Sequence, residues 1–390
     1  MSREVVQSRV FEYAREIVPA FNAYLYFRIG YWFAKRIARL LYRIRVGFVT
    51  PDCLDEIDTE ATVVFVMSHR SNMDYVLVSF LIAEKTALSY AVGEWARIWP
   101  PQSLVRSMGA FFVRRNSGDP LYRRVLERYI AMATQEGVCQ AVSEGGLSRD
   151  GALRDPKLGI LDYMLRNYDH TQDREIVFVP VGLNYDRTLE DRTLLRSLDE
   201  NAKRRSKSFV LRTTTKFISH NLFLMLRSRW YRLGFAQVNF GHPVSARSFC
   251  EERGIRFDQL DTEERFNQVH ELATRLLANI DTVIPILPTA VICSVLLEES
   301  GNRLPAKEIV DRALQRIDTL KRQGELVTLP KQTRAHTLGL TLNMLVLRHI
   351  VVQENDNSCY VPETSQAILA YYANSIAPRL PKTGGALANR

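Results

Sequence analysis

The sequence predicts an α/β fold, a mixed sheet flanked by helices, with an amphipathic helical segment before it and a helical region after it. Short apolar runs rich in β-branched residues recur between residues 61 and 181, and segments of helical length separate them. Strands that alternate with helices favour a layered fold with a largely buried sheet. From residue 258 onward the apolar spacing is helical.

A chain of 390 residues is long enough for two or three folding units. The pattern predicts an amphipathic helical segment over residues 1–50 and an α/β domain over 51–257. A helical domain over 258–380 and a disordered tail over 381–390 follow.

Segment length and the share of β-branched residues distinguish the expected strands from the expected helices. Strands are expected at residues 61–67, 110–113, 138–142 and 176–181, and a strand with a turn at 235–243. Helices are expected at residues 1–48, 75–84, 120–136, 262–278 and 306–325. Residues 187–232 are rich in charge and are interpreted as an excursion, either a solvated face or a contact to phosphate or lipid.

Two apolar stretches raise the question of a membrane. In the first 50 residues aromatic and basic side chains alternate at helical spacing, and Arg28 and Lys35 interrupt any run of about 20 apolar residues. This segment either lies in the plane of an anionic membrane or packs its aromatic stripe on the protein's own core. Residues 282–297 carry no charge but include Pro285 and Pro288, which favours a buried helix after a proline-rich turn.

The overall charge narrows the class of partner. Lys and Arg number 52 against 43 Asp and Glu, a formal net charge of +9. This excess favours nucleic acid, anionic lipid or a phosphorylated substrate. The five cysteines have no paired spacing and are interpreted as reduced thiols of a cytosolic protein. The histidines show no metal-site spacing, and the amino terminus lacks the pattern of a secretory signal, so we expect no metal and no export.

The strongest chemical signal is the sequence TVVFVMSHRSNMDYVLVSF at residues 62–80. A buried strand delivers His69 into a polar turn, and Asp74 follows five positions later. Residues five apart differ by roughly 140° around a helix, so the two side chains meet only if His69 precedes the helix and Asp74 lies in its first turns. The carboxylate would then fix the imidazole tautomer and leave the other nitrogen to accept a proton.

Three further stretches have weaker signals by themselves. The sequence GAFFVRR ends a short strand at Arg114 and Arg115, whose planar guanidinium groups suit phosphate, although exposed arginines at a strand end are common. SEGGLSRDG follows another strand and combines paired glycines with Arg149. The strand IVFVPVG contains Pro180 and would shape an apolar wall.

Together, HRSNMD with Tyr75, GAFFVRR, SEGGLSRDG and VPVG resemble, in this order, the four sequence blocks of the glycerolipid acyltransferases. The resemblance is closest to the glycerol-3-phosphate acyltransferase branch. It extends to DPKLGIL, GLNYDR, VNFGHPVS and LAYYANS, which look like the bacterial membrane-bound enzyme, and it covers roughly residues 50 to 375. The departure lies at the amino end, where this chain has only about 50 residues before the catalytic region.

The resemblance implies that a fatty acyl group moves from acyl-CoA or acyl-carrier protein to the 1-hydroxyl of glycerol 3-phosphate, giving lysophosphatidic acid. It implies that His69 is the base and Asp74 its support, with neither an acyl-enzyme nor a metal or other cofactor. The residues that it implies for the substrate phosphate are Arg114, Arg115, Glu144, Gly145 and Arg149. Phe112, Val179 and Pro180 would line the acyl and acceptor pocket. It places the protein at the cytoplasmic face of an anionic membrane, peripheral or monotopic, without nucleic acid.

Alternatives remain at this point. The acceptor could instead be dihydroxyacetone phosphate or a lysophospholipid. A different class is a basic peripheral membrane or nucleic-acid-binding protein without catalysis, suggested by the basic runs at residues 35–45 and 203–232. A serine hydrolase is disfavoured because no GxSxG occurs.

Overall fold

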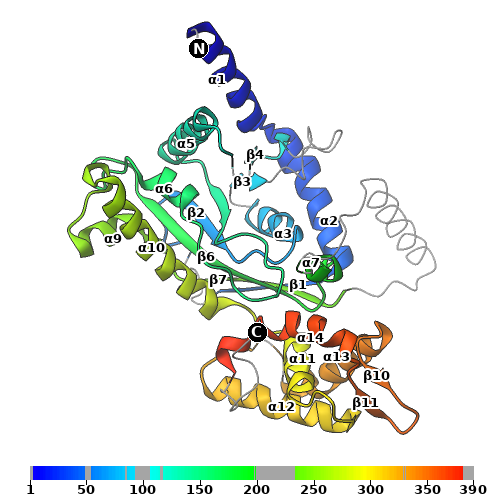
Figure 1. Cartoon of the computed structure of the whole chain (residues 1–390). Helices are drawn as coiled ribbons and strands as arrows, with labels where there is room; N and C mark the ends of the chain where they lie inside the picture. The colour runs from blue at the N-terminus through cyan, green and yellow to red at the C-terminus, as the bar shows by residue number, and fades with distance from the viewer. Residues whose placement is uncertain are drawn as a thin grey trace.

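The structure is a computed structural model that describes residues 3–48, 54–83, 86–92, 106–114, 117–196, 198, 233–327, 329 and 331–380. The charged stretch at 203–232, the predicted tail at 381–390, Cys53 and Arg115 lie outside the described residues. A mixed sheet with helices on both faces forms the larger part, and a group of helices lies beside it (Figure 1). The predicted fold class is therefore confirmed.

The main sheet has eight strands, with the path β1-β7-β6-β2-β5-β3-β4 and with β8 paired to β6. Strands β6, β2, β5, β3 and β4 run parallel, whereas β7 is antiparallel to β6 and parallel to β1. The strand bounds are β1 Arg43–Phe48, β2 Thr62–Met67, β3 Ser89–Val92, β4 Ala110–Phe112, β5 Gln140–Ser143, β6 Ile176–Tyr185, β7 Phe235–Phe240 and β8 Val244–Ser245.

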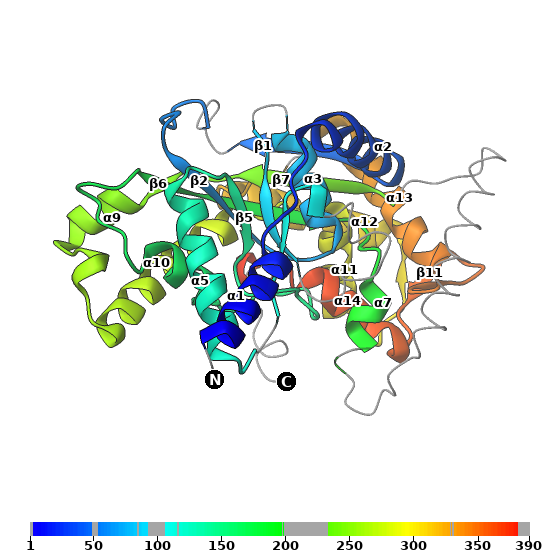
Figure 2. The ribbon, with the colours of Figure 1, turned by 90° about the horizontal axis from the view of Figure 1, so that it is seen from above.

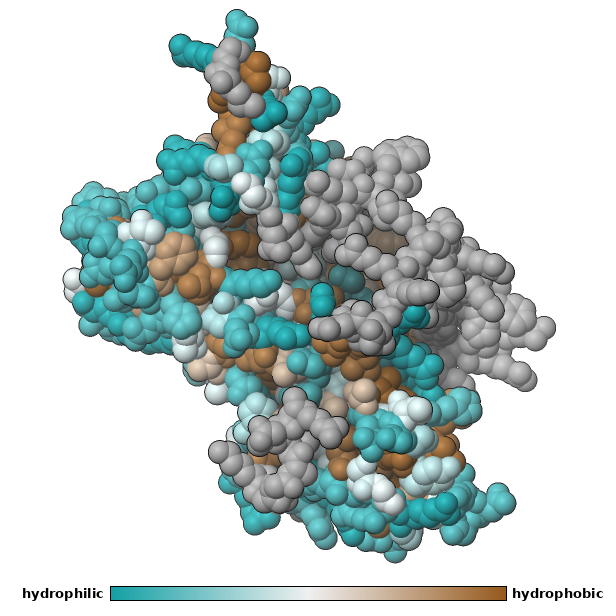
Figure 3. Space-filling view, viewed as in Figure 1, coloured by the Kyte–Doolittle hydropathy of each residue, from teal (hydrophilic) through white to brown (hydrophobic). Residues whose placement is uncertain are grey.

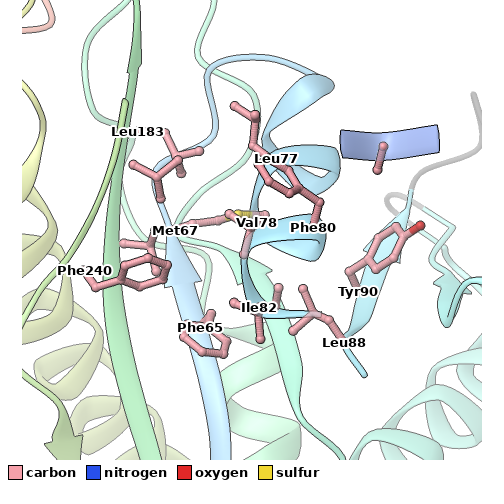
Figure 4. Packing of buried hydrophobic residues seen from close by; sticks show 14 of the residues in the cluster. Phe65, Met67, Leu77, Val78, Phe80, Ile82, Leu88, Tyr90, Leu183 and Phe240 are labelled. Atoms are coloured by element: carbon pink, nitrogen blue, oxygen red, sulfur yellow. The ribbon is translucent and has the colours of Figure 1, made fainter. Parts of the chain in front are cut away.

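Alternate residues of β2 face two different cores, as the two-residue period of a strand requires. Phe65 and Met67 join a cluster with α2 (Tyr31–Leu41) and α3 (Met73–Ile82), part of which Figure 4 shows. Val64 and Val66 face the opposite cluster. Its helices are α1 (Arg3–Ile17), α5 (Pro120–Gln135), α6 (Gly159–Leu165), α9 (Ala246–Arg253) and α10 (Thr262–Val283). Helices α1 and α5 contact each other at the edge of this layer (Figure 2).

A third core belongs to the carboxyl-terminal helices. Its helices are α11 (Pro288–Glu298), α12 (Ala306–Arg322), α13 (Arg334–Leu347) and α14 (Gln366–Ala373), accompanied by α7 (Asp191–Arg196) and a small sheet of β9 (Leu304–Pro305), β10 (Val352–Gln353) and β11 (Ser358–Tyr360). The expected buried helix after the proline-rich turn is α11, which begins at Pro288 and buries nearly its whole length.

Two differences from the expected ranges concern the packing of the sheet. Residues 43–48 form β1 and hydrogen-bond to β7, so the prediction of helix through residue 48 is wrong there. The sequence RIRVGF alternates apolar and basic residues with the period of a strand. Helix α10 packs on β6, so the sheet-containing part extends beyond residue 257.

Among the described residues, no single helix is long and apolar enough to cross a bilayer. Helices α10 and α11 reach the length and apolar composition of a membrane span only when they are taken together. The pair is bent by 90° at its junction.

Candidate active site

His69 and Asp74 come together at the carboxyl end of β2. His69 follows the strand by two residues, and Asp74 lies in the first turn of α3. His69 Nδ1 is 2.8 Å from Asp74 Oδ2, and the two residues are 5% and 0% exposed. The contact expected between them is therefore present. Because a carboxylate only accepts, the proton of this hydrogen bond is assigned to Nδ1, which leaves Nε2 as the basic nitrogen.

Backbone groups complete the environment of the Asp74 carboxylate. The N–H groups of Arg70 and Ser71 donate to Oδ2 at 2.6 and 2.9 Å. Asp74 therefore both orients His69 and closes the turn that carries it. The ring of Tyr75 packs edge-on against the imidazole of His69, with 5.3 Å between the ring centroids.

The loop after β5 lies against the same turn, because β2 and β5 are parallel neighbours whose carboxyl ends meet at one edge. Glu144 Oε1 accepts from the His69 N–H at 3.3 Å, and Ser148 N–H donates to the His69 carbonyl at 2.8 Å. Glu144 is buried, and burial raises its pKa to about 7. Glu144 thus supports the histidine backbone in this structure.

The two glycines after Glu144 have different surroundings. A Cβ on Gly145 would lie 2.2 Å from the Asp155 carbonyl oxygen, so this residue permits close packing within the loop. Gly146 has a φ of 117°, and the Lys157 ammonium would lie 3.6 Å from its Cβ. Arg149 is exposed in the same loop.

Arg114 follows β4 and lies against α1. Its Nε and Nη2 donate to the Glu16 carboxylate at 2.8 and 2.6 Å, and its guanidinium contacts the rings of Tyr13 and Tyr122. The side chain is about one third exposed. Arg115 lies outside the described residues.

The expected wall residues are buried in the sheet. Phe112 ends β4, and Val179 and Pro180 lie within β6. Phe112 and Val179 belong to the cluster that also contains α3. Two hollows of about 120 and 370 Å³ lie elsewhere, beside α5 and α6 and between α11 and α12.

Several residues around the site carried no assigned role in the sequence. Tyr185 donates to Asp74 Oδ1 at 2.5 Å. Glu190 accepts from Ser71 Oγ at 2.8 Å and from Asn72. Tyr371 of α14 contacts the Arg70 carbonyl at 3.4 Å. Tyr185 and Tyr371 lie in GLNYDR and LAYYANS, so the resemblance marked both stretches without indicating their contacts.

Among the described residues, no three histidine, cysteine or acidic side chains gather as a metal site would require. The cysteines that the structure describes are buried and unbonded.

A buried histidine–aspartate pair at the carboxyl edge of a mixed sheet suits proton abstraction from a hydroxyl. Residues 50–184, which include this pair, match the family model described as "Acyltransferase". Residues 220–378 match the model described as "Glycerol-3-phosphate acyltransferase C-terminal region". The chain therefore belongs to the glycerol-3-phosphate acyltransferase family.

Curated relatives agree with this assignment. The chain is 29% identical over 334 residues to the glycerol-3-phosphate acyltransferase of Pseudomonas entomophila (strain L48). This match covers 80% of this chain and 38% of that protein. It is 27% identical over 403 residues to the one of Pseudomonas syringae pv. syringae (strain B728a), covering 96% of this chain and 45% of that protein. The chain thus spans less than half the length of these two relatives.

One solved structure is similar at a low level. The 1-acyl-sn-glycerophosphate (LPA) acyltransferase of Thermotoga maritima has a TM-score of 0.35 and 16% identity. The match covers 70% of this chain and 86% of that one.

Proposed function

We propose that this chain transfers a fatty acyl group from acyl-CoA or acyl-carrier protein to the 1-hydroxyl of glycerol 3-phosphate, giving lysophosphatidic acid. The observation that carries the proposal is the contact of 2.8 Å between His69 and Asp74, which leaves Nε2 basic. The match of residues 220–378 to a region named for this enzyme supports glycerol 3-phosphate as the acceptor.

In the proposed reaction, His69 Nε2 takes the proton of the acceptor hydroxyl while its oxygen forms a bond to the thioester carbonyl carbon. The carbon–sulfur bond then breaks, and the imidazolium returns its proton to the departing thiolate. Asp74 stabilises the imidazolium between these two steps. No acyl-enzyme is formed, because the hydroxyl attacks the thioester directly.

The phosphate of the acceptor is proposed to bind cationic side chains beside His69 and Asp74. Arg149 is exposed in the loop that contacts His69, which supports its inclusion. Arg114, Arg115, Glu144 and Gly145 complete the proposed set, and Phe112, Val179 and Pro180 the proposed pocket. A phosphate held at a fixed distance positions the hydroxyl, and positioning can supply much of the rate.

The assay uses purified protein, each thioester donor, and glycerol 3-phosphate, dihydroxyacetone phosphate or lysophosphatidic acid as acceptor. We expect product from glycerol 3-phosphate and a loss of about 10²- to 10⁴-fold for His69→Ala. The matched control is His270→Ala, which changes an exposed histidine on α10. Product from lysophosphatidic acid alone would reject the acceptor, and full activity of folded His69→Ala would favour the non-catalytic alternative.

We further propose that α1 and α2 bind the cytoplasmic face of an anionic membrane. Phe11, Tyr24 and Trp32 are 78%, 68% and 61% exposed, whereas α2 buries Ala34 and Ala38 against the core. In Figure 3, hydrophobic residues lie among hydrophilic ones on α1 at the top of the view. Lys35 and Arg36 contact the rings of Tyr31 and Trp32, a mixture typical of interfacial helices.

Substitution tests the proposed membrane-binding surface better than deletion of residues 1–48, because that deletion would also remove β1 from the sheet. We expect Trp32→Ser with Phe33→Ser to weaken flotation with anionic vesicles, because two exposed aromatic anchors are lost. The control is Leu347→Ser, which changes a side chain that is 69% exposed in the carboxyl-terminal helices. Equal flotation of all variants would reject this surface.

A further inference from the structure

Tyr185 reaches the Asp74 carboxylate from the opposite side to His69. It is the last residue of β6, and its hydroxyl donates to Oδ1 at 2.5 Å, whereas His69 bonds to Oδ2. Tyr185 is 2% and Asp74 0% exposed. Both oxygens of the carboxylate are therefore engaged within the protein, and Tyr185 holds the one that His69 does not.

The sheet fixes the position of this hydroxyl. Tyr185 pairs with Ala236 of β7, and its N–H donates to the Asn184 side-chain oxygen at 2.9 Å. The Tyr185 ring packs on the ring of Tyr42, with 5.2 Å between centroids. A donor whose position is set by strand register and by packing on the Tyr42 ring has little freedom to leave Asp74.

From this geometry we infer that Tyr185 is a positioning residue for the proposed acyl transfer, acting through Asp74 on the orientation and basicity of His69. The inference rests on the proposed function of His69. A hydrogen bond to one carboxylate oxygen stabilises the anion and weakens its pull on the imidazole proton. It also prevents the carboxylate from rotating out of the plane in which it meets Nδ1.

Burial, and then the charge of Asp74, raise the pKa of Tyr185 well above its usual value. The hydroxyl therefore keeps its proton over the whole range in which the enzyme would be assayed. Tyr185 cannot take the place of the base, and its contribution is confined to donation.

Other charged and titratable groups face the same pair and belong in any account of its pH dependence. These groups are Arg70 in the catalytic turn, Glu144 in the loop after β5, Glu190 in the loop after β6, Tyr42 at the end of α2 and Tyr371 on α14. Tyr185→Phe leaves all of them in place and removes only the hydroxyl.

The test is the pH profile of kcat for Tyr185→Phe. Without the O–H donor, the Asp74 anion is less stabilised and holds the imidazolium more strongly, so the free base forms only at higher pH. We expect the acid limb to move to higher pH and kcat at the optimum to fall by about tenfold. KM for the acceptor should stay within about twofold, because Tyr185 is proposed to act through Asp74 and not on the substrate.

The control is Tyr26→Phe, which removes an equally buried hydroxyl that accepts a hydrogen bond from the Leu88 N–H at 3.0 Å. We expect it to keep the wild-type pH profile. Thermal unfolding of both variants reports their folding. A Tyr185→Phe enzyme with wild-type kcat and an unmoved acid limb would overturn the inference.

A double-mutant cycle gives a second, independent readout. If Tyr185 acts through Asp74, adding Tyr185→Phe to Asp74→Asn should cause no further loss of the residual rate. Multiplicative losses would overturn the inference. Wild-type protein without transferase activity would reject the proposed function itself. An active wild type whose kcat and pH profile are unchanged by Tyr185→Phe would reject only the role of Tyr185.

Discussion

The guanidinium of Arg114 is held by the Glu16 carboxylate through two parallel hydrogen bonds, from Nε to Oε1 at 2.8 Å and from Nη2 to Oε2 at 2.6 Å. This pair connects the end of β4 to the last turn of α1. A residue proposed to bind the acceptor phosphate is thus already engaged by an acid of the same chain.

The pair gives a first prediction. Glu16→Gln removes the negative charge that competes for Arg114, so we expect KM for glycerol 3-phosphate to fall about two- to fivefold while kcat is unchanged. The matched control is Glu12→Gln, an exposed acid on the same helix. An unchanged or raised KM for Glu16→Gln would remove Arg114 from the phosphate-binding set.

The second prediction concerns Glu144 and pH. Because burial raises its pKa from 4.5 to about 7, the folded state binds this proton more tightly than the unfolded state. The stabilising contribution is present below pH 4.5 and is lost as pH rises to about 7. In Glu144→Gln, which stays uncharged, the free energy of unfolding relative to wild type should therefore rise between pH 4.5 and 7, by about 3 kcal/mol at most.

Urea unfolding of wild type and Glu144→Gln at several pH values measures this difference. Asp186 and Glu190 also have raised pKa values, but they are common to both proteins and cancel in the comparison. A difference that is independent of pH would contradict the raised pKa of Glu144.

The third prediction concerns the buried pair of Arg348 and Asp191, which joins α13 to α7. Both side chains are less than 10% exposed, and the Tyr372 hydroxyl also donates to Asp191 Oδ2 at 2.5 Å. Asp191→Asn leaves a buried cation without its counter-charge, so we expect the protein to lose about 3 kcal/mol of stability. Glu354→Gln, which breaks the exposed pair with Arg303, should change stability by less than about 1 kcal/mol in the same unfolding measurement.

The fourth prediction concerns Gly145. A methyl group there would meet the Asp155 carbonyl at 2.2 Å, so Gly145→Ala must displace the loop that supports the His69 backbone. Displacement of about 1 Å can cost 10²-fold in rate, and we expect a loss of that order in kcat. Gly159→Ala has open space around the added group and should retain wild-type activity. Wild-type activity in Gly145→Ala would show that the loop accommodates the methyl group.

Much of the sheet could be predicted from the sequence because its central strands are buried on both faces and appear as continuous apolar runs. IVFVPVG in β6 and TVVFVM in β2 are examples. Strands β1 and β3 show no such continuous apolar run: β1 mixes arginines with apolar residues, and β3 begins with the polar Ser89. The contact of His69 with Asp74 could be expected from their spacing together with the preceding strand, because His69 then lies in the turn before the helix and Asp74 in its first turn.

The remaining contacts of the site could not be predicted, because they join residues far apart in the chain. Tyr185 lies 111 positions from Asp74, and Tyr371 lies 301 positions from Arg70. Periodicity reports which face of an element is buried but not which distant side chain it meets. The same reasoning explains Arg114, whose partner Glu16 lies in a helix 98 positions earlier.

The strand order also bears on how the chain is made. Strand β1 is an edge strand whose hydrogen-bonding neighbour is β7, and roughly 190 residues separate the two along the chain. At typical rates of about 5 to 20 residues per second, a ribosome needs about 10 to 40 seconds to add that length. During this interval β1 follows directly behind the exposed aromatic side chains of α2, without its partner. Strand β7 can therefore take its place between β1 and β6 only after strands β2 to β6 have been synthesised.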